Sequence, residues 1–289
     1  MPHASKATYP ARIEQASPAP HLNKHITMVT DIFPILAQAS YYYSDYGTAA
    51  GATGAMYGST TLIGLALLII TGIIGMVVQQ GLNASIRRHS AEAAPLTGAE
   101  TARRMLDRYG LHNVRITSTP GQLTDHYNPA DCTVNLSETV YNQATVAAMA
   151  VAAHECGHAV QHAHAYPWLG LRSSLVPMVN IGSRLGQIVL ILGLILLGMG
   201  SGTTVAWLGL ALYALTTLFA FITLPVEFNA SRRALAWLEE SGLAGRAMHG
   251  QASNALHWAA MTYVAAALSS LAMLAYYALI ILSRSQSRD

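Results

Sequence analysis

The stretch Thr60–Val78 reads TTLIGLALLIITGIIGMVV, and no charged side chain occurs anywhere from Tyr46 to Gly81. Because a helix rises about 1.5 Å per residue, a run of this length crosses a hydrocarbon core of about 30 Å. The run begins too far from the N-terminus, and lacks the basic flank, for a cleaved signal peptide. We therefore expect a permanent transmembrane helix over residues 58–81.

Two further regions have the same apolar character. Residues 185–226 carry no charge and are interrupted at 198–204 by the turn-forming sequence GMGSGTT. This pattern predicts a hairpin of two spans over residues 185–224. The apolar run Ala260–Leu282 predicts a fourth span over residues 259–283, with a buried amphipathic helix as the alternative. The sequence therefore predicts four spans.

The composition agrees with a membrane protein. Hydrophobic residues make up 52% of the 289 residues and charged residues only 10%, whereas a soluble domain carries about 25% charged residues. The net charge of +2, with scattered basic residues, excludes a nucleic-acid-binding protein. Two cysteines are too few for a secreted disulfide scaffold. The partner expected first is the lipid bilayer.

Arginines near the ends of the spans predict the topology. Those after span one, before span two and after span three are Arg87, Arg88, Arg103, Arg104, Arg172, Arg184, Arg232, Arg233 and Arg246. The turn at 198–204 has none. The positive-inside rule then places residues 82–184 and 225–258 in the cytoplasm and both termini outside. Arg284 and Arg288 weigh against an outside C-terminus.

The two ends of the chain carry no fold signal. Residues 1–57 are rich in Pro, Ala, His and Tyr and follow neither a helical nor a strand period. We expect a flexible tail there. We expect residues 284–289 to form a short C-terminal tail.

Between spans one and two, the periodicity of the apolar residues changes twice. Thr97 and Glu100 have capping-box spacing and predict a helix that ends at Gly110. Short β-prone runs within residues 114–136, separated by Pro, Gly and Asn turns, predict a small β meander. Residues 142–164 are small and apolar and predict a second helix.

This second helix carries His154-Glu155-Cys156-Gly157-His158, an HExxH pattern. Residues four apart share a helix face, so both imidazoles point at one cation, and Glu155 reaches the water bound to it. A lone Glu in an otherwise apolar helix is costly to bury without a cation or hydrogen-bond partners. The alternative to a metal site is a cluster of polar side chains whose hydrogen bonds are satisfied within a membrane-protein core. Cys156 lies about 200° round the helix from His154 and is expected to face away.

A catalytic zinc site needs a third protein ligand and an open fourth position. The chain lacks the third His of an HExxHxxGxxH motif and the intramembrane Asp of an LDG motif. Glu227 directly follows span three, at the start of a helix expected after Pro225, and the hairpin returns it to the side that holds His154 and His158. We therefore expect one Zn²⁺ per chain, held by these three residues. A carboxylate that merely complements a helix dipole is the alternative for Glu227.

Five stretches, in this order, closely resemble the YugP-like membrane zinc metallopeptidases of bacteria. They are PLTGAETARRMLDRYGL, LTDHYNP, VAAHECGHAVQ, LRSSLVPMVNIGS and LPVEFNASRRAL, and the resemblance covers residues 58–283. It implies a neutral zinc peptidase of the gluzincin kind in the bacterial inner membrane, acting on proteins or peptides. By this resemblance His154 and His158 are zinc ligands, Glu155 is catalytic and Glu227 is the third ligand.

The implied fold is a multi-pass α-helical membrane protein with a zincin-like α+β catalytic segment, a small β meander plus the HExxH helix. The chain is also similar to the HtpX-like membrane peptidases, whose third-ligand helix carries ExxAD. Ser231 stands here where their Asp orients a histidine.

The implied reaction is hydrolysis of a peptide bond by a zinc-activated water, with Glu155 as the general base. Candidates for stabilising the oxyanion or positioning the substrate are His126, Tyr127 and Arg232. A turn held by side-chain hydrogen bonds is the alternative for His126 and Tyr127, and a topogenic charge is the alternative for Arg232. An edge strand before the HExxH helix is expected to align an extended peptide. His162 continues the face of His154 and His158 and is expected at a solvent-facing helix end.

Two other functions compete with the peptidase. The first is a metal transporter, which 12 histidines suggest, but the His and acidic residues avoid the spans, where an ion pathway needs polar groups. The second is an inactive membrane scaffold that keeps zinc for folding. A structural zinc site has no use for the general base Glu155.

Overall fold

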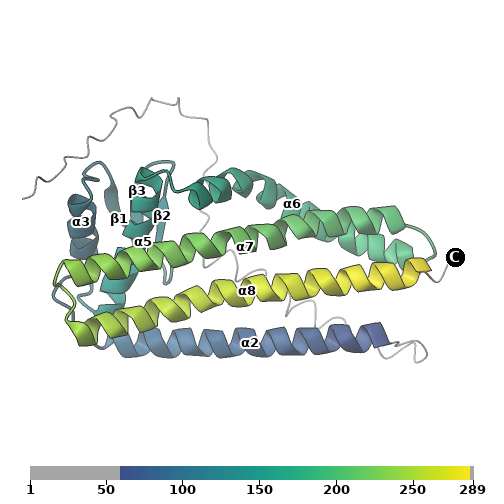
Figure 1. The fold of residues 1–289 in the computed structure, drawn as a ribbon, viewed down its shortest axis with the longest axis horizontal. Coiled ribbons are helices and arrows are strands. Elements are labelled where there is room, and N and C mark those ends of the chain that lie inside the picture. Colours follow the sequence, from purple (N-terminus) through teal and green to yellow (C-terminus); the bar gives the residue numbers. More distant parts are fainter. Residues whose placement is uncertain (1–58, 287–289) are drawn as a thin grey trace, which may run out of the picture.

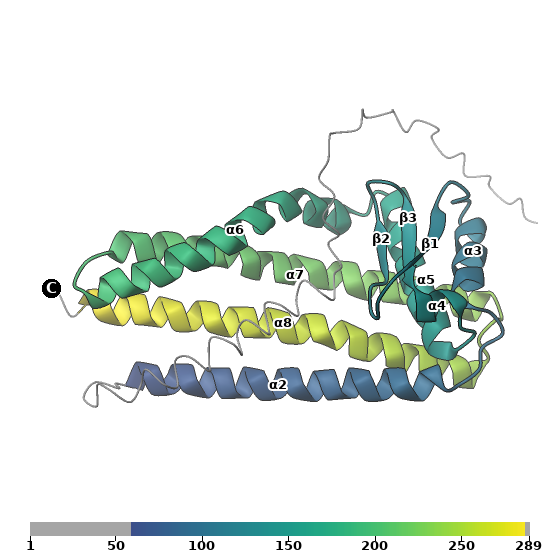
Figure 2. The same ribbon diagram turned by 180° about the vertical axis from the view of Figure 1, so that it is seen from behind.

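The computed structural model describes residues 59–286, so the predicted tail at 1–57 lies outside the described part. Four long helices run side by side, and a small α+β segment packs at one end of them (Figures 1 and 2). These helices are α2 (Ser59–Ser90), α6 (Pro167–Gly198), α7 (Thr203–Glu240) and α8 (Arg246–Gln286). Each is long and apolar enough to cross a membrane. By the length and composition of these helices, the prediction of four spans is confirmed.

The helices extend well beyond the apolar stretches that predicted them. With 38 residues, α7 is about 57 Å long, nearly twice the thickness of a hydrocarbon core. The start of α2, the α6–α7 turn and the end of α8 lie together at the end opposite the sheet (Figure 1). The other ends of these helices therefore project toward the α+β segment.

Pro225 lies inside α7, which runs through it without a break. The expectation that a separate helix begins after Pro225 is therefore wrong. Proline removes one backbone N–H donor, but packing of neighbouring helices holds such a helix together in a membrane protein. Glu227 thus lies within a continuous helix that also contains the third span.

Glycines let the hairpin helices approach closely. A Cβ on Gly193 of α6 would lie 2.4 Å from Ala206 N of α7, and a Cβ on Gly209 would lie 2.3 Å from Leu190 Cα. Small residues at such contacts are typical of membrane helices, where close backbone packing replaces the hydrophobic effect. In both views α8 lies between α7 and α2 (Figures 1 and 2).

The helix predicted from the Thr97 capping box is α3 (Gly98–Arg108). The Thr97 side chain accepts a hydrogen bond from Glu100 N, and the Glu100 carboxylate accepts one from Thr97 N at 2.8 Å. Gly110 adopts φ = 71°, as a helix stop requires. The prediction of this helix and of both its ends is confirmed.

The predicted meander is wrong in its topology. The three strands are β1 (Arg115–Thr119), β2 (His126–Asn128) and β3 (Thr133–Ser137), and their order in the sheet is β1-β3-β2. β1 pairs parallel with β3, and β2 pairs antiparallel with it. The physical reason is burial: Val134 and Leu136 of β3 are fully buried, so β3 takes the centre.

The HExxH helix is α5 (Val146–Ala163), preceded by the short α4 (Glu138–Asn142). The Thr145 side chain caps α5 by accepting from Ala148 N. Fourteen of its 18 residues are buried, which makes α5 the centre of the α+β segment. It packs against the sheet, α3 and the projecting ends of α7 and α8 (Figure 2).

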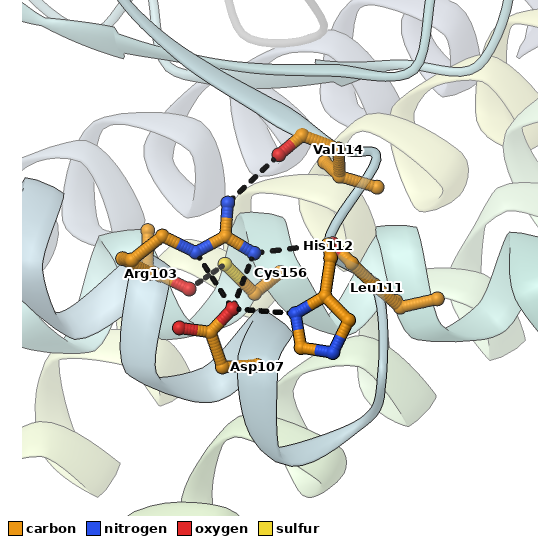
Figure 3. A network of polar contacts seen from close by, with 7 residues as sticks. Arg103, Asp107, Leu111, His112, Val114 and Cys156 are labelled. Atoms are coloured by element: carbon orange, nitrogen blue, oxygen red, sulfur yellow. Dashed lines mark hydrogen bonds and ion pairs between the residues drawn. The ribbon is translucent and has the colours of Figure 1, made fainter.

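The face of α5 that carries Cys156 packs against α3. The Cys156 thiol is fully buried and lies 3.6 Å from Ala102 O. Beside it, Arg103 forms an ion pair with Asp107 and donates to the main-chain oxygens of Leu111 and Val114 (Figure 3). These contacts fix the turn from α3 to β1, and the thiol faces away from the histidines, as predicted.

Candidate metal centre

Three predicted ligands from two helices meet in one place. The Oε2 atom of Glu227 lies 3.3 Å from His154 Nε2 and 3.6 Å from His158 Nε2. One potential ligand atom of each residue lies within 4.8 Å of the others. With zinc bonds of about 2.0–2.1 Å, two corners of a tetrahedron are about 3.3–3.4 Å apart. The distances from Glu227 to the two imidazoles therefore fit a tetrahedral zinc ion.

The burial of Glu227 also indicates a cation. Its side chain is only 2% exposed, and within residues 59–286 its polar neighbours are the imidazoles of His154 and His158 and the side chain of Tyr263, with no hydrogen bond of ordinary geometry to its oxygens. A buried carboxylate that lacks hydrogen bonds costs several kcal/mol unless a positive charge compensates it. A divalent cation between Glu227 and the two imidazoles would provide this charge.

Each histidine has a partner at its other ring nitrogen. Ser231 Oγ lies 3.0 Å from Nδ1 of His154, and Gln161 Oε1 lies 3.0 Å from Nδ1 of His158. Such partners orient the ring and leave Nε2 available for a metal. Ser231 therefore lies beside a candidate ligand histidine, where the HtpX-like resemblance predicts an Asp.

Glu155 lies next to the three candidate ligands and is 8% exposed. Burial raises the pKa of its carboxyl group to about 7, and the negative charges of Asp125 and Glu227 act in the same direction, while the charge of His154 opposes them. The main-chain N–H of Tyr127 donates to the Glu155 carboxylate. A carboxyl group with a pKa near neutrality is suited to both accepting and returning a proton.

The other predicted candidates have different environments. His126 is buried in β2, and its Nδ1 lies 2.8 Å from Thr124 O. The Tyr127 hydroxyl lies 2.8 Å from Nδ1 of the exposed His162. Arg232 is exposed on α7, about 140° round the helix from Glu227. The structure therefore brings β2 to the site and leaves Arg232 outside it.

Sequence reasoning missed several residues at this centre. Gln161 contacts His158, and Gly157 lies against Ala230 of α7. Arg172, counted above as a topogenic charge, is 6% exposed, and its Nε has no hydrogen bond to the part of the chain that the structure describes. Tyr263 of α8 lies close enough to sense the charges of Glu227, Glu155 and Arg172. The one signal in the sequence was the amide side chain of Gln161, which follows His158 by one turn in an otherwise apolar helix.

Comparison with known proteins adds to this geometry. A family model described as "Putative neutral zinc metallopeptidase" matches residues 64–282. A protein of Bacillus subtilis (strain 168) named "Putative membrane protease YugP" is 44% identical over 187 residues. The alignment covers 65% of this chain and 81% of that protein. No solved structure matches the chain.

Proposed function

We propose that this chain, which belongs to the family of neutral zinc metallopeptidases matched over residues 64–282, is a membrane-embedded endopeptidase that uses one zinc ion. One observation carries the proposal. The carboxylate of Glu227 is almost fully buried and faces two imidazole nitrogens at 3.3 and 3.6 Å, close to the spacing of zinc ligands, with Glu155 beside them.

The residues divide the chemistry between them. When bound by His154, His158 and Glu227, zinc would lower the pKa of a bound water to about 7 and polarise the scissile carbonyl. Glu155 accepts a proton from the attacking water, while the oxygen of that water bonds to the carbonyl carbon. The C–N bond then breaks, and Glu155 returns the proton to the leaving amine.

The substrate is a protein or peptide in extended conformation. β2 is an edge strand of the sheet and contacts Glu155 through the N–H of Tyr127. An extended peptide added to such an edge pairs through its main chain. This mode places a peptide carbonyl near the metal and gives loose sequence specificity. His126 and Tyr127, which lie on β2, remain the candidates for positioning it.

The site lies at the boundary between the membrane and the water phase. Glu227 is the first charged residue after the charge-free stretch 185–226 and lies on the helix that contains it. From the distribution of arginines we propose that this side faces the cytoplasm and that the membrane is the bacterial inner membrane.

The experiment compares the full-length wild type with Glu155→Gln in detergent. A fluorophore-labelled, unstructured protein serves as the substrate, and the zinc content of both proteins is measured. We expect hydrolysis to fall about 10²–10⁴-fold in the variant, with zinc retained. Chelation should abolish the wild-type activity and added zinc should restore it. Equal hydrolysis by both proteins would contradict the proposal, and a zinc-loaded wild type without hydrolysis would favour the scaffold.

A further inference from the structure

Gln161 connects one candidate ligand to the helix that carries another. It follows His158 by three residues on α5 and is fully buried. Its Oε1 lies 3.0 Å from His158 Nδ1. Its Nε2 donates to Val226 O at 2.8 Å and to Asn229 Oδ1 at 3.0 Å, both on α7. All three contacts of this amide are therefore made at the metal centre.

The orientation of the Gln161 amide follows from its partners. Val226 O is a main-chain carbonyl oxygen and can only accept, so the amide nitrogen must face it. The amide oxygen then faces His158 Nδ1 and can only accept as well. His158 must therefore carry its proton on Nδ1, which leaves the lone pair of Nε2 directed at Glu227.

The partner of His154 does not impose such a choice. Ser231 Oγ lies 3.0 Å from Nδ1 of His154, but a hydroxyl group either donates or accepts. Gln161 has no equivalent freedom because both hydrogens of its amide are engaged by α7. Arg233 extends the arrangement, since its Nε donates to Asn229 Oδ1 at 2.8 Å. The stronger constraint therefore acts on His158.

We propose that Gln161 is the positioning residue of the metal centre. It holds His158 in the tautomer that leaves Nε2 free to bind a metal. It also links His158 on α5 to Val226 on α7, the neighbour of Glu227. One side chain thereby sets the spacing of ligands from two helices. The inference rests on the metal site of the proposed function and does not require that the protein hydrolyses peptides.

The test measures the zinc dissociation constant by chelator competition, together with thermal stability, for the full chain in detergent. Gln161→Met keeps the packing but removes the acceptor and both donors. Gln161→Glu keeps an acceptor for His158 Nδ1–H but places a carboxylate against Val226 O. Gln143→Met, at an exposed position, is the matched control.

Zinc affinity and stability should rank these variants differently. We expect Gln161→Met, which loses both the acceptor for His158 and the donors to α7, to bind zinc about 10–100-fold more weakly. Gln161→Glu, which keeps the acceptor and loses only the donors, should lie between Gln161→Met and the wild type, and the control should stay within about threefold of the wild type. The melting temperature should be lowest for Gln161→Glu, whose buried carboxylate faces a carbonyl oxygen. If Gln161→Met does not fold, Gln161→Ala, which leaves room for water, replaces it.

Zinc binding by Gln161→Met within twofold of the wild type would overturn the inference. An affinity order that follows the melting temperatures would overturn it as well, because a merely structural role predicts that order. Failure of the proposed function looks different: the wild type would hydrolyse no substrate, while the affinity order stays as expected.

Discussion

Gly157 of α5 lies directly against the main chain of Ala230 of α7. A Cβ on Gly157 would be 2.6 Å from Ala230 O and 3.1 Å from its carbonyl carbon. Gly157 lies between His154 and His158 in the chain, and Ala230 lies between Glu227 and Ser231. The two helices are therefore in close backbone contact beside the candidate ligands.

This contact predicts that Gly157→Ala damages the metal centre. The added methyl group meets rigid backbone, so the helices must move apart, at a cost of about 1–3 kcal/mol. Because His154 and His158 lie on one helix and Glu227 on the other, we expect zinc affinity to fall at least tenfold. Chelator competition measures this fall.

Gly170→Ala provides the matched control. Gly170 also lies in a helix, α6, but an added Cβ there meets no atom of residues 59–286 within 4 Å. Alanine stabilises a helix by up to about 1 kcal/mol relative to glycine, so stability should be unchanged or slightly higher and zinc binding normal. Equal zinc affinity in both variants would show that the close contact does not set the ligand spacing.

Burial of the Glu155 carboxyl group predicts a pH-dependent loss of stability in the metal-free protein. Burial raises its pKa from 4.5 to about 7 in the folded state. Between these values the folded state binds more protons than the unfolded state, so stability falls as pH rises. At about 1.4 kcal/mol per pH unit, the cost above pH 7 is on the order of 3 kcal/mol.

Glu155→Gln removes this cost because the amide stays neutral. In the chelated protein we expect the variant to melt at a higher temperature than the wild type at pH 8 and at the same temperature near pH 4.5. Glu239→Gln, at an exposed position on α7, should leave the pH dependence unchanged. A stability difference that is independent of pH would show that burial does not raise the pKa of Glu155.

The contact between Ser231 and His154 predicts a modest loss of zinc affinity when the hydroxyl group is removed. Ser231→Ala removes the oxygen 3.0 Å from His154 Nδ1, so the ring loses its orienting partner. We expect zinc affinity to fall about tenfold, at the lower end of the range for such partners. Ser174→Ala, at an exposed position of α6, should leave the affinity unchanged, and an unchanged affinity in Ser231→Ala would exclude this role.

Patterns that depend on nearby residues predicted their structures well. The four apolar stretches, the Thr97 capping box and the Gly110 stop depend on local periodicity and side chains within a few positions. The family resemblance drawn from five motifs is confirmed as well. The HExxH spacing placed both imidazoles on one side of α5, because residues four apart share a helix face.

Features that depend on distant partners were not predictable. The parallel pairing of β1 with β3 is decided by which strand is most buried, and β-prone runs of similar length do not reveal this. Pro225 in the sequence predicted a helix boundary. The helix α7 nevertheless continues, because packing around Pro225 compensates the lost hydrogen bond. The partners of Gln161 lie 65 and 68 residues away on α7.

The central claim is that His154, His158 and Glu227 hold one zinc ion. The most direct test is the metal content per chain of the detergent-purified wild type and of Glu227→Ala, measured side by side. We predict about one zinc in the wild type and a large loss in the variant, since two imidazoles alone leave the site without a third protein ligand. Full zinc content in Glu227→Ala, or no zinc in either protein, would contradict the account.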